Sequence, residues 1–394
     1  MRRIYLDYAS TTPVDSDVLA AMLSYFSEKF GNPGSLHSFG QEAQIAIDNA
    51  RSKVADFLGC LTQEIIFTGS ATEANNLAII GAVRAAKKAG VKNPHVITSA
   101  IEHKSVLEPI RKLEKDGEIE LTILNVSKNS LIDLEQLKKS LKENTVLVSI
   151  IYANNEIGTV QPISEISKII KNFRNWKLGT ALPLLHTDAA QAANYLNMKA
   201  ADLGVDLLTL SSQKIYGPKG TGVLYVKKGV LIEPQILGGE QEYGKRAGTE
   251  NVPNIVGMGA AIVKINEYKN KNGQILELRN FFIDNVLAKI KTASLNGNIE
   301  SCLPNVANIL FKGINSADLL MMLDMEGIAV SAGSACQARG ISGPSYVLRA
   351  MGLSEQDAKS SIRFSFGRQT TKEDIDYALE ILVKLVNKLT PDTK

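Results

Sequence analysis

The sequence predicts an α/β protein with a mostly parallel central sheet covered by helices, followed by a smaller α+β unit. From about residue 64 to residue 226, short apolar runs alternate with longer amphipathic stretches, which is typical of parallel strands joined by helices. After about residue 255 the order changes, because two long helical stretches lead into strands with helices between them. The change marks the start of the second unit.

Six apolar runs of the first part are predicted strands. They are "EIIFT" (64–68), "HVITSA" (95–100), "TVLVSIIYA" (145–153), "LPLLHTD" (182–188), "DLLTLSS" (206–212) and "GVLYV" (222–226). The amphipathic stretches predict helices at 71–90, 102–117 and 163–173. In the second part the expected helices are 256–268 and 275–292, and the expected strands are "NVANILF" (305–311) and "SIRFSF" (361–366). We therefore expect a large domain at 14–262 and a small domain made of 1–13 and 263–394.

The composition narrows the class of protein. Of 394 residues, 44% are apolar and 22% are charged, as in ordinary globular enzymes, and the net charge of +3 is too small to indicate binding to nucleic acid or an anionic membrane. No apolar stretch has the length of a signal peptide or a membrane span. Three distant cysteines and four histidines without metal spacing predict a cytoplasmic protein without a disulfide framework or a metal site.

Polar residues follow five of the predicted strands. In open α/β sheets, ligands bind beyond the carboxyl ends of the strands. The residues at these ends are Gly69, Ser70, Ala71, Thr72, His103, Asn154, Asn155, Asp188, Gln191, Ser211, Ser212, Gln213 and Lys214. Taken singly, most have ordinary explanations: Ser70, Thr72 or Asp188 as helix caps, His103 as a surface histidine and Lys214 as a solvated charge. These explanations do not account for polar residues at five successive strand ends that would lie together, and this pattern favours a ligand site.

The types of residue in this set indicate the ligand. "GSAT" (69–72) before a helix offers N–H groups and hydroxyls to a phosphate, but it is not a P-loop, and "GMGAAI" (257–262) fails as a dinucleotide fingerprint. A phosphate site, an aspartate and a lysine are what pyridoxal phosphate needs: the lysine forms a Schiff base, and the carboxylate keeps the pyridine nitrogen protonated. The set therefore predicts a pyridoxal-phosphate site.

Motifs spread in order over nearly the whole chain resemble those of cysteine desulfurases of the NifS/IscS type. They are "YLDYASTTP" (5–13), "GSATEANN" (69–76), "EHKSV" (102–106), "NNEIGTVQP" (154–162), "HTDAAQ" (186–191), "SSQKIYGPKG" (211–220), "RAGTEN" (246–251), "SAGSAC" (331–336) and "SIRFSFGR" (361–368). The resemblance implies a fold-type I pyridoxal-phosphate enzyme that forms a homodimer with its active site at the interface.

The resemblance also implies roles around the cofactor. Lys214 would be the Schiff-base lysine, Asp188 would pair with the pyridine nitrogen and Gln191 with the ring hydroxyl. His103 would stack on the ring and act as acid and base. The phosphate would be held by Ala71, Thr72 and Ser211, with Gln213 able to donate to it and Thr249 reaching the phosphate of the partner subunit.

The resemblance assigns the substrate L-cysteine to Asn155 and Arg363, which would bind its carboxylate; Asn155 also belongs to the cofactor set. The residues themselves support Arg363, because Ile362, Phe364 and Phe366 alternate onto one strand face and leave the arginine on the other. An ordinary surface ion pair is the alternative for Arg363.

Cys336 is the expected nucleophile. Small residues precede it, which predicts a mobile loop at about 329–345, whereas Cys60 and Cys302 have apolar neighbours and are predicted to be packed. The implied reaction converts L-cysteine to L-alanine and leaves a persulfide on Cys336. The sulfur would pass to an acceptor protein, such as an iron–sulfur scaffold or a tRNA-thiolation enzyme.

The chain departs from the family pattern at three places. Gln213 stands where a histidine is usual, 163–185 is longer than usual, and an extra residue lies near Arg339 and Gly340. We expect Gln213 to weaken cofactor binding and leave the chemistry intact. Two alternatives stay open: a selenocysteine lyase or another enzyme of the superfamily, and a sulfur-relay or scaffold protein without turnover. An aminotransferase is disfavoured, since it has no use for a loop cysteine.

Overall fold

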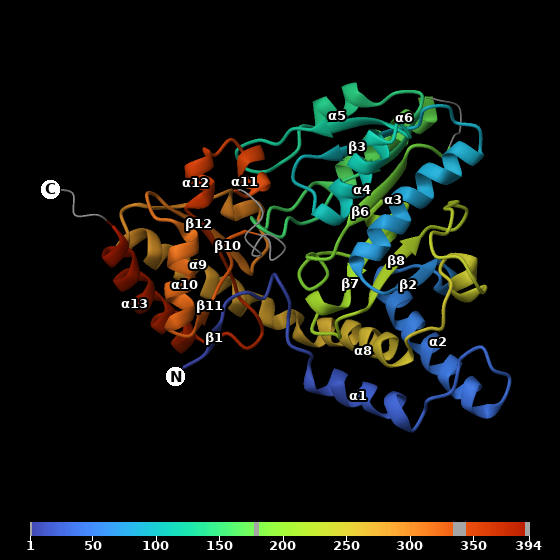
Figure 1. The fold of residues 1–394 in the computed structure, drawn as a ribbon, viewed down its shortest axis with the longest axis horizontal. Coiled ribbons are helices and arrows are strands. Elements are labelled where there is room, and N and C mark those ends of the chain that lie inside the picture. Colours follow the sequence, from blue (N-terminus) through green and yellow to red (C-terminus); the bar gives the residue numbers. More distant parts are fainter. Residues whose placement is uncertain (1, 177–180, 334–343, 391–394) are drawn as a thin grey trace.

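The computed structural model describes residues 2–176, 181–333 and 344–390, arranged as two lobes joined by the N-terminal segment and by α8 and α9 (Figure 1). The lobe that contains α2, α3 and α6 is built on a seven-stranded sheet, and the lobe that contains α13, drawn mostly in orange to red, is built on a three-stranded sheet. The chain starts beside β1 in the smaller lobe, crosses to the larger one and returns.

The seven-stranded sheet has the strand order β2-β8-β7-β6-β5-β3-β4. Its strands are β2 Ile65–Thr68, β3 His95–Ser99, β4 Glu120–Leu124, β5 Thr145–Ser149, β6 Leu184–Asp188, β7 Leu207–Ser211 and β8 Gly222–Val226. Only β8 runs against its neighbours, since the chain between β7 and β8 is too short for a helical crossover. The prediction of a mostly parallel sheet is confirmed.

Helices cover both faces of this sheet. They are α1 Ser16–Ser27, α2 Ser38–Leu58, α3 Ala71–Lys88, α4 Lys104–Lys115, α5 Leu134–Ser140, α6 Ile163–Trp176, α7 Ala200–Leu203 and α8 Val252–Tyr268. The pleat of β3 sends Val96 into one apolar cluster with α3 and α4, and Ile97 into another with α2, α6 and α8. Two helical layers therefore enclose the sheet, as the alternating pattern predicts.

The smaller lobe contains the antiparallel sheet β12-β10-β9 and the parallel pair β1-β11. The strands are β1 Ile4–Tyr5, β9 Ala293–Leu295, β10 Val306–Phe311, β11 Ile328–Ala329 and β12 Ser361–Ser365, and the helices are α9 Asn272–Lys289, α10 Ser316–Met325, α11 Tyr346–Ala350, α12 Glu355–Lys359 and α13 Lys372–Leu389. Ile362, Phe364 and Phe366 lie in its core, where Phe282 packs 4.7 Å from Phe364 between ring centroids. Residues Ile4 and Leu6 belong to the same core, which supports the proposal that 1–13 form part of the small domain.

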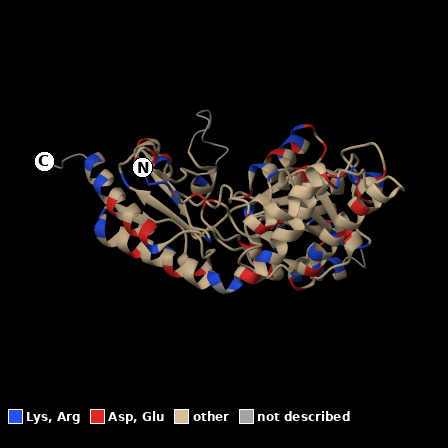
Figure 2. Ribbon diagram, turned by 90° about the horizontal axis from the view of Figure 1, so that it is seen from below, with Lys and Arg blue, Asp and Glu red and all other residues tan. Residues whose placement is uncertain are grey.

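Charged residues of both signs are interspersed along the helices of both lobes (Figure 2). Within the described ranges, no helix combines the length and the apolar character needed to cross a bilayer. The same residues contain no group of three or more His, Cys, Asp or Glu side chains placed to hold a metal ion.

Candidate active site

A cavity of about 250 Å³ lies where the carboxyl ends of β5, β6 and β7 meet the starts of α3 and α4. It is lined by Ala9, Ser10, Ser70, Ala71, Thr72, His103, Ser105, Ile151, Ala153, Asn155, Asp188, Ala190, Gln191, Ser211, Gln213, Lys214 and Arg363. The cavity thus brings together ten of the predicted site residues: Ala71, Thr72, His103, Asn155, Asp188, Gln191, Ser211, Gln213, Lys214 and Arg363. Residues from the small lobe and the N-terminal segment close the other side.

Lys214 ends a 3₁₀ turn, Ser212–Lys214, directly after β7. Its Nζ donates to the carbonyl oxygens of Ala9 and Ser10, each at 2.6 Å, and its own carbonyl accepts a hydrogen bond from Asn194 Nδ2 at 2.7 Å. The lysine is therefore held at its side-chain amine and at its main-chain carbonyl, and it is not a solvated surface charge.

The start of α3 forms the anion-binding end of the cavity. Ser70 caps this helix by accepting from the Glu73 N–H at 3.1 Å, so Ala71 and Thr72 begin the helix with N–H groups that have no intrahelical acceptor. Gly222 permits the approach of β8, because a Cβ there would lie 2.5 Å from the carbonyl carbon of Ser70. The capping alternative is thus correct for Ser70, and it leaves the helix end available to an anion.

Asp188 and His103 are connected by a chain of buried hydrogen bonds. Asn75 Nδ2 donates to Asp188 Oδ2 and to Ser105 Oγ, both at 2.8 Å, and Ser105 Oγ lies 2.7 Å from His103 Nδ1. The Ala190 N–H donates to the second carboxylate oxygen of Asp188 at 3.0 Å. These donors fix the orientation of the carboxylate in the cavity.

The tautomer of His103 follows from its contacts. The Ser105 N–H donates to His103 Nδ1 at 3.1 Å, so Nδ1 is an acceptor and a neutral ring carries its proton on Nε2. Burial lowers the pKa of His103, and Lys214 and Lys104 lower it further, against the attraction of Asp188. The interpretation as a surface histidine is wrong: the residue caps α4 and faces the cavity as a neutral imidazole.

Arg363 crosses from β12 to the other side of the cavity with 1% of its surface exposed. Its Nη2 donates to Asp7 Oδ1 and Ser10 Oγ, both at 2.6 Å, and its Nη1 donates to the Asn155 carbonyl at 2.7 Å. Arg363 Nε and Asn155 Oδ1 are buried without a hydrogen-bond partner among the described residues. The alternative of a surface ion pair is wrong, since the pair with Asp7 is buried at the cavity.

Two predicted residues stand apart from this cavity. Thr249 is exposed and does not line the cavity of its own chain. Cys336 lies outside the described residues, as does the predicted extra residue near Arg339 and Gly340.

The other two cysteines are packed thiols, as the sequence predicts. Burial, with Glu64 nearby, raises the pKa of Cys60 to about 12. Burial also raises the pKa of Cys302 to about 11, and its Sγ lies 3.1 Å from the Ile157 carbonyl oxygen. Neither thiol ionises near neutral pH, so neither is suited to attack sulfur.

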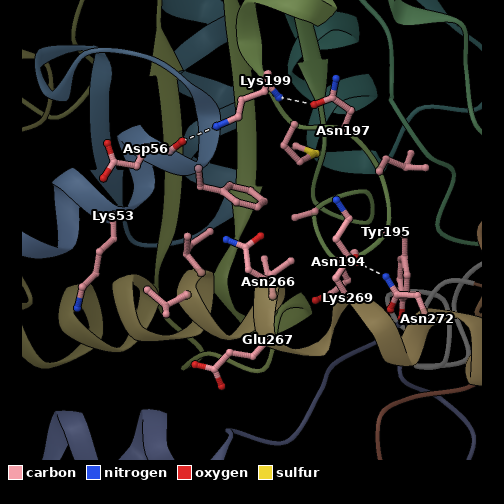
Figure 3. Close-up of a pocket in the computed structure, with 17 residues that line it drawn as sticks. Lys53, Asp56, Asn194, Tyr195, Asn197, Lys199, Asn266, Glu267, Lys269 and Asn272 are labelled. Atoms are coloured by element: carbon pink, nitrogen blue, oxygen red, sulfur yellow. Dashed lines mark hydrogen bonds between the residues drawn. The ribbon is translucent and has the colours of Figure 1, made fainter.

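A larger hollow of about 630 Å³ lies elsewhere, between α2, α8 and the segment 193–199 (Figure 3). Asn266 and Asn194 face it, and Lys199 closes one end by donating to the Asp56 carbonyl at 2.6 Å. It contains none of the predicted site residues, so volume alone would have pointed away from the chemistry.

Comparison with known proteins identifies the family. Residues 4–378 match the family model described as aminotransferase class-V. Over 98% of its length, the chain is 46% identical to the cysteine desulfurase IscS of Dictyoglomus turgidum, covering 95% of that protein. It is 45% identical to the cysteine desulfurase IscS 1 of Archaeoglobus fulgidus, with 98% of this chain and 97% of that protein covered.

The chain belongs to the cysteine desulfurase family. Among solved structures, a NifS-like protein superimposes with a TM-score of 0.90 at 35% identity, covering 98% of this chain and all of the other. The structure described as SspA in complex with cysteine matches with a TM-score of 0.79 at 36% identity over 92% of this chain and 98% of the other. The fold predicted from the sequence is therefore confirmed, and this family member carries its polar cavity where we expected it.

Several residues of the site were not singled out from the sequence. Asn75 and Ser105 lie inside two of the quoted motifs, and Asp7, Ala9 and Ser10 lie inside the first motif, but no role was assigned to them. An available signal for Asn75 was its place on the apolar face of α3, where a buried amide must find partners. Nothing local distinguishes Asp7, whose partner Arg363 is 356 positions away.

Proposed function

We propose that this chain converts L-cysteine to L-alanine with pyridoxal phosphate and receives the sulfur as a persulfide on Cys336. One observation carries the proposal: a single cavity combines a lysine, a buried carboxylate, a helix start and a buried arginine. A lysine and a carboxylate suit the aldehyde and the ring nitrogen of this cofactor, and a helix start suits its phosphate.

The donor set fits pyridoxal phosphate. The N–H groups of Ala71 and Thr72 would hold the phosphate, with Ser211 and Gln213 beside them and Thr249 contributed by a partner subunit. Asp188 would hold the ring nitrogen and Gln191 the ring hydroxyl, since both residues line the cavity. When bound, the cofactor supplies an electron sink for the charge that develops at the substrate α-carbon.

The substrate carboxylate would bind between Arg363 and Asn155. Arg363 Nε is a buried donor without a hydrogen-bond partner among the described residues, which suits the acceptor oxygens of a carboxylate. Asn155 lines the same cavity, and its amide nitrogen can donate to the same group. Asp7 and the Asn155 carbonyl fix the guanidinium plane, which orients Nε for an incoming carboxylate. The cysteine-bound structure of a 36% identical relative agrees with this choice of substrate.

Proton movement would fall to Lys214 and His103. In its neutral form His103 can give a proton only from Nε2, because Nδ1 accepts the Ser105 N–H. The amine of Lys214, once released from the Ala9 and Ser10 carbonyls, would take the α-proton of the substrate. Cys336 would accept the sulfur atom as Cys336–S–SH, and the carbon skeleton would leave as L-alanine.

A homodimer completes the proposal. Large apolar side chains with 47–91% of their surface exposed are concentrated in α1, α2 and the segment between them: Leu19, Leu23, Phe26, Phe30, Leu36, Phe39 and Ile45. Burying them against a second copy would also give the exposed Thr249 a partner cavity to reach.

We further propose that the protein acts in the cytoplasm, which is consistent with the free thiols of Cys60 and Cys302. We also propose that it delivers sulfur to an iron–sulfur scaffold or a tRNA-thiolation enzyme.

The test is alanine release from L-cysteine by the purified, cofactor-loaded protein with a reductant, with Cys336→Ser beside it. We expect alanine from the parent and almost none from the variant. A loaded parent that releases no alanine would overturn the proposal and favour a relay protein, and release that is faster from selenocysteine and independent of Cys336 would favour a selenocysteine lyase.

A further inference from the structure

Arg368 follows β12 in the small lobe and extends its side chain across the junction between the lobes. Its guanidinium carbon lies 4.0 Å from the ring centroid of Tyr216 and 4.2 Å from that of Tyr268, within the range of cation–π contacts. Its Nη1 is buried and has no hydrogen-bond partner among the described residues. Burying a charged nitrogen without a hydrogen-bond partner costs free energy. A guanidinium held between two rings despite this cost suggests that Arg368 has a role in the structure of the site.

Tyr216 ties this contact to the lysine turn. It lies two residues after Lys214 and has a φ of +65°, a left-handed conformation that is costly for a residue with a side chain. The Arg368 N–H donates to the Tyr216 hydroxyl at 2.8 Å, and the Tyr216 N–H donates to Thr12 Oγ1 at 2.9 Å. Contacts from outside the turn therefore maintain its strained backbone.

Asn194 makes a second connection. Its Nδ2 donates to the Lys214 carbonyl at 2.7 Å, and its Oδ1 accepts from Arg368 Nη2 at 3.4 Å. Its own carbonyl accepts from Asn272 Nδ2 at 2.9 Å, at the start of α9 (Figure 3). Arg368 thus reaches the peptide of Lys214 through Tyr216 on one side and through Asn194 on the other.

We propose that Arg368 is a positioning residue that fixes the Lys214 turn from the small lobe. The inference rests on the proposed function, in which Lys214 carries the cofactor and Arg363 binds the substrate carboxylate. Arg363 and Arg368 belong to one segment, 361–368. The positions of the guanidinium that would bind the substrate and of the guanidinium that contacts the Lys214 turn therefore depend on the same stretch of backbone. A change in the orientation of the small lobe would then move the substrate and the Lys214 amine together.

The test compares Arg368→Met with Arg279→Met, which removes another buried arginine of the small lobe, one that donates to the Leu303 carbonyl and to Asn280 Oδ1. Three quantities are measured: Tm, kcat and KM for cysteine, and the pH midpoint at which the visible absorption of the cofactor-loaded protein changes. For Arg368→Met we expect kcat to fall by roughly ten- to a hundredfold, as for a misplacement of about 1 Å, and the midpoint to shift by about half a unit or more. Arg279→Met should lower only Tm.

Asn194→Asp tests the link itself, because the carboxylate still accepts from Arg368 but cannot donate to the Lys214 carbonyl. It should shift the midpoint as Arg368→Met does. If Arg368→Met does not fold, Arg368→Lys replaces it, since a lysine cannot stack a flat group on both rings. Parental midpoints in the arginine variant and in Asn194→Asp would overturn the proposal, even with a lower Tm. The pH midpoint of the cofactor absorption can be measured without catalytic turnover. It therefore tests the role of Arg368 even if the parent protein releases no alanine.

Discussion

The two sides of the cavity are constructed differently. On the sheet side, Asp188 ends a buried strand and Ala71, His103 and Lys214 follow buried strands, so each is placed by the strand or helix beside it. On the junction side, the Arg363 guanidinium donates hydrogen bonds to Asp7, which is 356 positions away in the sequence, and to Ser10 and the Asn155 carbonyl. The sheet side therefore depends on local structure, while the junction side depends on two lobes meeting correctly.

The largest effect is expected on the junction side. Arg363→Lys loses the planar fork and leaves Asp7 or the Asn155 carbonyl without its donor, so KM for cysteine should rise by roughly ten- to a hundredfold. Steady-state kinetics measure this. Asp7→Asn is the matched variant: it removes a negative charge that competes with the substrate for the guanidinium, so KM should fall. A parental KM in Arg363→Lys would contradict the role given to Arg363.

On the sheet side, Asn75→Ala removes the donor shared by Asp188 and Ser105. The loss of one buried hydrogen-bond partner costs about 1–3 kcal/mol, so we expect the dissociation constant of pyridoxal phosphate to rise by about tenfold or more. The control is Asn76→Ala, the next residue, whose amide donates to the Thr72 carbonyl within its own helix. Equal effects of the two variants in a cofactor titration would contradict the network.

The pH dependence of stability distinguishes two buried groups beneath the sheet side. Burial raises the pKa of Glu102 to about 8, so the folded state keeps a proton that the unfolded state loses above about pH 4.5, and this group lowers stability as pH rises through that window. Burial lowers the pKa of His186 to about 4, so this group lowers stability as pH falls from about 6.5 to 4.

Glu102→Gln should therefore gain stability relative to the parent as pH rises from 4.5 to 8, by a few degrees in Tm at pH 8, on the scale of about 2–4 °C per kcal/mol. The glutamine oxygen can still accept from Ser99 and from the Ile151 N–H. Thermal unfolding of both proteins across this range is the measurement. A difference in Tm that does not change with pH would show that Glu102 is ionised throughout.

The smallest effect concerns Gln213, which lines the cavity beside Lys214. Gln213→His introduces a side chain that can carry charge toward a phosphate, so cofactor affinity should increase by a fewfold, as for a charge-assisted hydrogen bond at a partly open site. Competitive loading of the two proteins with pyridoxal phosphate would measure the difference. An unchanged affinity would mean that Gln213 does not reach the phosphate.

The sequence predicted the sheet side well because its signals are local. A buried strand followed by polar residues identified Asp188, Ser211 and Lys214, and all three line the cavity. Helices α1 and α2 were not predicted. The core-facing side of α2 is formed largely by small residues such as Ala43, Ala46 and Ala50, which give a weak apolar pattern.

The junction side was less predictable because it arises from tertiary pairing. Strand alternation placed Arg363 on the correct face, but nothing in the sequence near Asp7, Ala9 or Ser10 indicates that they contact Arg363 and Lys214. Asn194 and Arg368 were missed for the same reason, since their contacts with the lysine turn join segments far apart in the chain. Such pairs become visible only when the two lobes are placed together.

The most direct test of the site is to reduce the cofactor-loaded protein with borohydride and to locate the labelled lysine by peptide mass mapping. If the cavity holds pyridoxal phosphate as proposed, the pyridoxyl group will be found on Lys214, and Lys214→Ala will carry no label. A label on another lysine, or a loaded protein that cannot be labelled, would contradict the assignment of this cavity as the active site.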